Sequence, residues 1–179
     1  MRRWKQAAEG FSALGTNAAS ATHRLIYLAG VHGGGLGTVP VYALETIGSD
    51  AVNPLIESLT STNKTTKLGA LYGLRTLRIE RAVPHLLNCL GDPDAHIREE
   101  AVNVLALIKP PRDAVIERLI RVLRDPELAV SRIAARALGR FGSAASKAVP
   151  ALQQLRREAP SRNELREAIA TITNSVNAP

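Results

Sequence analysis

The chain has 179 residues, of which 45% are apolar, 22% are charged and only 3% are aromatic, and its formal net charge is +7. This composition is typical of one soluble domain with an aliphatic core. The single cysteine, Cys89, excludes an internal disulfide framework and favours a cytoplasmic location, and no apolar run reaches the roughly 18 residues that cross a bilayer.

The first fifteen residues resemble the second half of a helical hairpin that recurs later in the chain. Ala7, Phe11, Leu14 and Gly15 align with Ala134, Leu138, Phe141 and Gly142. We therefore expect residues 1–15 to form a half-repeat, which either caps the array or is the edge of a longer chain.

Residues 16–48 are predicted to form two helices joined by a glycine-rich segment, Val31 to Gly37. A His-Gly-Gly-Gly string, present here at 32–35, forms part of the oxyanion hole in some esterases, where it accompanies a Gly-x-Ser-x-Gly nucleophile motif. That motif is missing from the sequence. The segment is therefore interpreted as a hairpin turn, which should tolerate alanine at Gly34.

The clearest copy of the repeated unit runs from Ala82 to Leu105. Pro84 falls in the first turn of its first helix, where the missing N–H is not needed. Gly91-Asp92-Pro93-Asp94 ends that helix, and Asp94 is placed to cap a second helix over 95–108. Two short helices cannot bury both apolar stripes, so the unit needs neighbours on either side.

The same unit recurs along the whole chain. First-helix anchors recur at intervals of 30, 31, 33 and 33 residues, namely Leu25, Leu55, Leu86, Leu119 and Leu152. Second-helix anchors recur at 30, 31, 33 and 34 residues, namely Leu44, Leu74, Leu105, Leu138 and Ile172. These columns divide the rest of the chain into repeats at 49–78, 79–109, 110–142 and 143–179. The last of them carries polar Gln153 and Arg156 in apolar columns, as a C-terminal cap requires.

The phrases AVPHLL, GDPDAHIREEA and AARALGRFG resemble HEAT repeats of the bacterial type related to phycobilin lyases. The resemblance spans about Ala7 to Ile172. It implies an all-α, right-handed α–α superhelix of the HEAT and armadillo type, with about five hairpins whose second helices line the concave side. It implies little about function, since such repeats serve as scaffolds in many settings.

No residues in the sequence converge on a catalytic, cofactor or metal site. None of the histidines has a histidine partner at i+3 or i+4, and none is followed by glutamate, whereas the hydroxylases of this architecture use repeated His-Glu pairs for iron. Asp92, Asp94, Asp125 and Glu127 fall in turns, where capping explains them. We therefore expect a protein that is not an enzyme and has no cofactor.

Three functions remain open from the sequence. The first is a protein-interaction scaffold whose partner binds the groove lined by the second helices. The second is a nucleic-acid binder similar to the DNA-alkylation repeat proteins, using Arg132, Arg136 and Arg140 on one helix, or the stripe of Arg118, Arg121 and Arg124 on its partner. The third is a subunit of a lyase-like enzyme. Scarce aromatic residues favour the first over the second.

Helix geometry predicts which residues of the groove meet the partner. Positions two and six residues before the second-helix anchor lie about 160° and 120° away from it and are expected to face solvent. The candidate partner-binding residues in these columns are Tyr42, Tyr72, Asn103, Arg132 and Arg136. Exposed tyrosine and arginine are the residue types that most often anchor interfaces.

Overall fold

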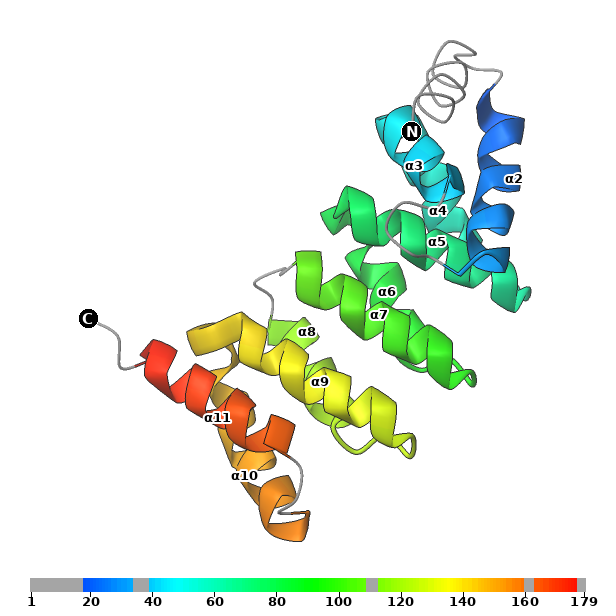
Figure 1. Cartoon of the computed structure of the whole chain (residues 1–179). Helices are drawn as coiled ribbons and strands as arrows, with labels where there is room; N and C mark the ends of the chain where they lie inside the picture. Colours follow the sequence, from blue (N-terminus) through cyan, green and yellow to red (C-terminus); the bar gives the residue numbers. More distant parts are fainter. Residues whose placement is uncertain (1–17, 34–38, 109–112, 160–162, 177–179) are drawn as a thin grey trace. The chain divides into compact units, whose positions relative to one another are not determined.

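The computed structural model describes residues 18–33, 39–108, 113–159 and 163–176, which form α-helices and short 3-10 helices with no β-strand among them (Figure 1). The helices are α2 (Ala18–Val31), α3 (Val39–Ile47), η2 (Gly48–Ala51), α4 (Val52–Ser58), α5 (Lys64–Leu77), η3 (Glu80–Ala82), α6 (Val83–Cys89), α7 (Ala95–Ile108), α8 (Asp113–Val122), α9 (Leu128–Phe141), η4 (Gly142–Ala148), α10 (Val149–Glu158) and α11 (Asn163–Val176). The all-α fold predicted from the sequence is confirmed.

The chain divides into two compact units, Met1–His85 and Leu86–Pro179, with the division inside α6. In the second unit, α9 lies between α7 and α11, and these three helices form one layer. Helices α8 and α10 pack behind them, α8 against α9 and α10 against α11. The second unit is thus a row of second helices backed by first helices. The repeat boundaries themselves stay predictions.

The anchor columns form the core. Each anchor is at most 6% exposed, in the first helices (Leu25, Leu55, Leu86, Leu119, Leu152) and in the second helices (Leu44, Leu74, Leu105, Leu138, Ile172) alike. The single thiol, Cys89, is also buried. The 19- or 20-residue separation of paired anchors therefore identified the buried side of each helix correctly.

Helix ends follow the predicted capping chemistry. Helix α6 begins one residue before Pro84, and the Asp94 carboxylate accepts hydrogen bonds from the N–H groups of His96 and Ile97, at 2.9 and 3.4 Å. Gly48 and Gly142, which follow α3 and α9, have φ of +65° and +57°. Glycine adopts such positive φ angles with less strain than residues that carry a side chain, so both positions favour it.

In the first unit, α2 packs against its predicted partner α3 and also against α5. The contact with α5 is made backbone to backbone, at Gly30 and Gly69. A Cβ atom at Gly30 would overlap the Thr65 carbonyl oxygen, and one at Gly69 would overlap the Ile26 carbonyl oxygen. The sequence analysis did not anticipate this crossing.

Two expectations fall on residues that the structure does not describe. The N-terminal half-repeat at 1–15 and the tolerance of alanine at Gly34 both lie outside the described residues. Of the glycine-rich segment, Gly33 is described and has φ of +63° with open space around it, as a turn residue should.

Candidate functional site

The five predicted partner-binding residues are divided between the two units. Tyr42 on α3 and Tyr72 on α5 belong to the first unit, whereas Asn103 on α7 and Arg132 and Arg136 on α9 belong to the second. Tyr42 is 40% exposed. Asn103 is half-buried, and Arg132 and Arg136 are exposed.

The prediction that Tyr72 faces solvent is wrong, because its side chain is only 6% exposed. Every residue from Leu68 to Leu74 is buried. Helix α5 packs against α2, α3 and α4, so its middle has no solvent-facing side. The guanidinium of Arg75 lies 5.4 Å from the centre of the Tyr72 ring, within cation–π range. Tyr72 is therefore a packing residue.

In the second unit, Asn103 and Arg136 come together at a hollow of about 90 Å³ between α7 and α9. A second hollow of about 230 Å³ lies between α9 and α11. Small residues line both hollows, Ala106 and Ala137 in the first and Gly139 and Ala168 in the second. The two hollows exist because these small side chains leave the grooves between neighbouring helices unfilled.

Arg136 and Arg140 line both hollows. They stand one helical turn apart on α9, and both are exposed. Within the described part of the chain neither side chain forms a hydrogen bond or an ion pair. We call the face made by α7, α9 and α11, with these two hollows, the arginine groove.

Arg132, by contrast, is engaged by α11. Its guanidinium forms an ion pair with Glu164, with Nε donating to Oε1 at 2.7 Å. The pKa of Glu164 is lowered, mainly because its carboxylate accepts a hydrogen bond from its own backbone N–H, and further because of the hydrogen bond and charge of Arg132 and the charge of Arg136. Arg132 therefore joins two helices and is less free to bind a partner than Arg136.

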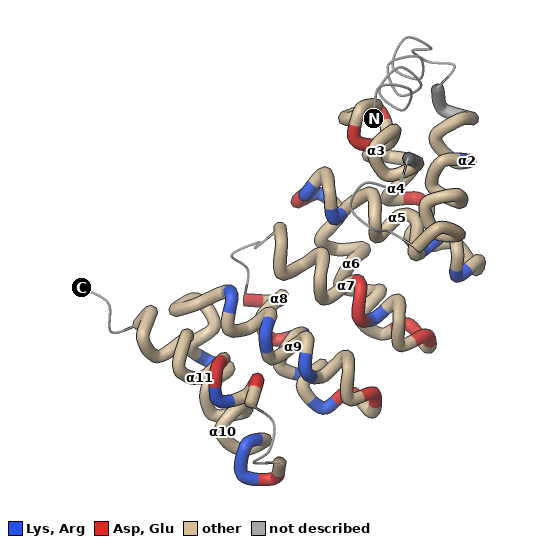
Figure 2. The backbone as a smooth tube through the Cα atoms, viewed as in Figure 1, with Lys and Arg blue, Asp and Glu red and all other residues tan. Residues whose placement is uncertain are grey.

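Acidic residues border the arginines on both sides (Figure 2). On α7, Glu99 lies 3.9 Å from the ring nitrogen of His96, and on α11, Glu164 and Glu167 line the larger hollow. The positive charge of the groove is therefore concentrated on α9. The sequence analysis named Arg140 in the arginine stripe of the nucleic-acid alternative but not among the partner-binding residues, and it selected none of these α11 residues.

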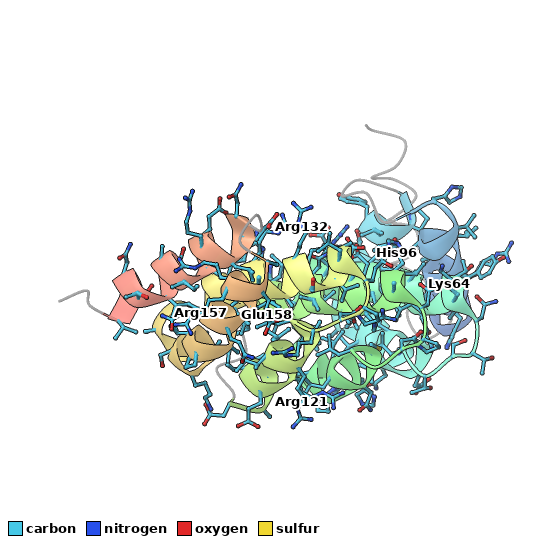
Figure 3. All side chains as sticks on the ribbon, turned by 90° about the horizontal axis from the view of Figure 1, so that it is seen from below. Lys64, His96, Arg121, Arg132, Arg157 and Glu158 are labelled. Carbon is cyan, nitrogen blue, oxygen red and sulfur yellow. The ribbon has the colours of Figure 1, made fainter. Side chains whose placement is uncertain are left out.

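The alternative arginine stripe, on α8 and the turn that follows it, is mostly engaged. Figure 3 shows Arg121 and Arg132 on opposite sides of this unit. Arg118 Nη2 donates to the Leu87 carbonyl oxygen at 3.0 Å, and Arg124 lies 3.6 Å from the Glu158 carboxylate. A hollow of about 220 Å³ is lined by all three arginines of the stripe and by Asp125. Arg136 and Arg140, by contrast, line their hollows together and have no hydrogen bond or ion pair among the described residues.

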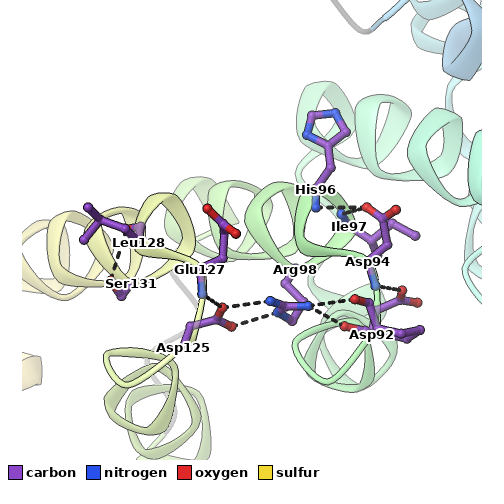
Figure 4. A network of polar contacts seen from close by, with 10 residues as sticks. Asp92, Asp94, His96, Ile97, Arg98, Asp125, Glu127, Leu128 and Ser131 are labelled. Carbon is purple, nitrogen blue, oxygen red and sulfur yellow. Dashed lines mark hydrogen bonds and ion pairs between the residues drawn. The ribbon is translucent and has the colours of Figure 1, made fainter.

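A buried ion pair holds the start of α7 to the turn before α9 (Figure 4). Arg98 on α7 binds the Asp125 carboxylate through both Nε and Nη2, at 2.7 and 2.8 Å, and its Nη1 donates to the carbonyl oxygens of Asp92 and Pro93. Asp125 also accepts from the N–H of Glu127 at 2.9 Å. This network fixes the spacing of α7 and α9, the two helices on either side of the smaller hollow.

The pKa values of this pair are shifted by their mutual hydrogen bonds and charges, against the effect of burial. Burial raises the pKa of Asp125, but the hydrogen bonds from Arg98 and from the backbone of Glu127, with the charge of Arg98, outweigh it and leave the pKa lowered. The pKa of Arg98 is raised, chiefly by the hydrogen bond to Asp125. Both groups are therefore charged at neutral pH, and the ion pair is intact there.

Among the described residues, no group of three or more His, Cys, Asp and Glu side chains is arranged to hold a metal ion. None of the described helices is long and apolar enough to cross a membrane.

A family model described as HEAT repeats matches residues 52–114 and 83–172, which together cover more than half of the chain. The chain is a HEAT-repeat protein. No curated protein matches it. The match confirms the predicted fold class, an all-α solenoid of the HEAT and armadillo type.

Solved structures share the fold of this HEAT-repeat protein. An engineered protein is similar with a TM-score of 0.58 at 22% identity, over 94% of this chain and 97% of that chain. A second engineered protein gives 0.58 at 25% identity, over 93% of this chain and 47% of that chain. A designed armadillo repeat protein in complex with the peptide (KR)4 gives 0.58 at 18% identity, over 96% and 90%.

Proposed function

We propose that this HEAT-repeat protein is a non-enzymatic protein-interaction scaffold that binds an extended segment of a partner protein in the arginine groove. The observation that carries the proposal is the pair of adjacent hollows with shared arginines. Arg136 and Arg140 line both hollows, and small residues line the space between the helices. A chain lying along α9 would place side chains in the hollows on either side of it and polar groups on the guanidinium groups.

The size of the hollows favours peptide side chains over a small-molecule substrate. Pockets that enclose drug-sized ligands measure roughly 300 to 1,000 Å³. The hollows of the groove measure about 90 and 230 Å³ and are open to solvent along the helices. Each is suited to one side chain, so affinity would come from several contacts along a segment. Exposed arginines are common anchors in such interfaces.

The designed armadillo repeat protein supports this mode of binding. That protein, of similar fold, is in complex with a peptide. Stacked helices leave grooves of this kind between neighbouring repeats, where such a segment can lie. We extend only the mode of binding to this chain, not the sequence of the peptide.

Selection of peptides from a displayed random library tests the proposal. Thr171 is exposed and lines the larger hollow, so Thr171→Trp should fill it. Thr173 is a matched control: it lies on the same helix, is exposed, and donates its hydroxyl to a backbone carbonyl four residues earlier, as Thr171 does. It does not line the hollow.

Peptides selected on the wild type should bind Thr171→Trp at least about tenfold more weakly, because a filled hollow excludes the side chain that enters it. They should bind Thr173→Trp as tightly as the wild type. Circular dichroism should show equal helix content in all three proteins. Equal binding to the wild type and Thr171→Trp, or failure to select any peptide, would contradict the proposal.

A further inference from the structure

We propose that the arginine groove selects an acidic segment, in which two carboxylates two residues apart contact Arg136 and Arg140. This inference rests on the proposed function, since it names the chemistry of the partner for the same surface. It follows from the charge available in the groove, from the spacing of the arginines, and from the acidic residues beside them.

The available charge is that of Arg136 and Arg140. The Arg132 guanidinium is already paired with Glu164. Arg136 and Arg140 are exposed and form no ion pair within the described residues. Arginine stays protonated at any physiological pH, and its planar guanidinium matches a carboxylate with two parallel hydrogen bonds. Two such groups side by side favour a partner that brings two carboxylates.

The spacing fits alternate residues of an extended chain. Four residues along an α-helix rise about 6 Å, which is the axial separation of Arg136 and Arg140. Alternate residues of an extended chain point to one side and lie about 6.6 Å apart. A segment with acidic residues at i and i+2 can therefore contact both arginines at once, and the side chain at i+4 is directed to the same face.

The neighbouring carboxylates favour a short acidic segment over a nucleic acid. Glu167 and Glu164 line the same hollow as the arginines, and Glu99 lies on α7 on the other side of α9. A nucleic acid carries a phosphate at every nucleotide and would have to pass over these carboxylates. A peptide can be acidic only at the residues that meet Arg136 and Arg140, and neutral or basic elsewhere.

Fluorescence anisotropy with three labelled probes tests the inference. The probes are a peptide of alternating glutamate and serine, a peptide of the same length with alternating lysine and serine, and an oligothymidylate of matched length. The variant Arg136→Gln/Arg140→Gln removes the two groove charges. The control Arg121→Gln/Arg124→Gln removes the same charge from two exposed residues that line another hollow, and Figure 3 shows Arg121 on the side opposite to Arg132.

The glutamate peptide should bind the wild type at least about tenfold more tightly than the lysine peptide does, because opposite charges attract at the contact and like charges repel. The groove variant should lower the affinity for the glutamate peptide by at least about tenfold, and the control by less than about threefold. Equal binding of both peptides, or equal losses in the two variants, would overturn the inference. So would tighter binding of oligothymidylate than of the glutamate peptide.

The two experiments fail separately. Library peptides that depend on Thr171 but lack acidic pairs would leave the scaffold proposal intact and refute the acidic preference. An absence of any peptide that depends on Thr171 would refute the scaffold proposal itself.

Discussion

Replacement of Arg98 by methionine should be among the most destabilising single changes in the second unit. Methionine keeps most of the apolar stem but removes all four hydrogen bonds of the guanidinium, two to Asp125 and two to the carbonyl oxygens of Asp92 and Pro93. The side chain of Asp125 is 6% exposed. Its carboxylate would be left buried beside only the Glu127 N–H.

The expected loss can be worked out from these contacts. Removal of one partner from a buried ion pair costs about 3 to 5 kcal/mol, and the remaining bond from Glu127 places this case near 3. Loss of the two bonds to neutral carbonyl oxygens adds about 1 kcal/mol. A total of about 4 kcal/mol lowers Tm by about 8 to 16 °C in a protein of this size.

Urea unfolding followed by circular dichroism measures this loss. The exposed pair of Arg124 and Glu158 provides the control, because Arg124→Met should cost less than about 1 kcal/mol. The double variant Arg98→Met/Asp125→Leu should be more stable than Arg98→Met, since it no longer buries an unpaired charge. A loss below about 1 kcal/mol for Arg98→Met, or a double variant no more stable than the single one, would refute the reasoning.

Three further predictions concern stability. Gly69→Ala should destabilise the protein by at least about 2 kcal/mol in thermal unfolding, because its Cβ overlaps a carbonyl of α2. Gly91→Ala should change stability by less than about 1 kcal/mol, because its Cβ would make only an ordinary van der Waals contact, 3.6 Å from the Asn88 carbonyl oxygen. Asn63→Ala should cost about 1 kcal/mol in urea unfolding because the Asn63 side chain caps α5 through the Thr66 N–H, and an unchanged midpoint would contradict that role. Since folding lowers the pKa of Asp125, the stability that its carboxylate contributes is present above the unfolded-state pKa of about 3.9 and is lost as the pH falls through the folded-state pKa. Asp125→Asn should therefore flatten the decline of the free energy of unfolding below about pH 4, and equal slopes for the two proteins would argue against this role.

The core was predictable because burial depends on spacing within single helices. The anchor residues of the first and second helices recur at nearly constant intervals, and each is buried. Capping by Asp94 was also predictable, since an N-cap depends only on the next few residues. These features require no knowledge of how distant helices meet.

The surface was less predictable because exposure depends on what covers a helix. A helical wheel shows that Tyr72 points away from Leu74, but it does not show that α5 is packed by three other helices. The wheel succeeded for Arg132 and Arg136 because the groove side of α9 is open. The contribution of Glu164 depends on α11 lying beside α9, a contact between residues 32 positions apart.

The glycine crossing of α2 and α5 limits how the first unit can diverge in sequence. Where helices meet through side chains, as at the anchor leucines, a substitution can be absorbed when neighbouring side chains adopt other rotamers. At Gly30 and Gly69 the neighbours are backbone carbonyls, which have no rotamers to change. Any larger residue must displace a whole helix. A copy of α2 or α5 could therefore replace the original in a rearranged array only if it carried its glycine with it, whereas helices that meet through side chains could be exchanged more freely.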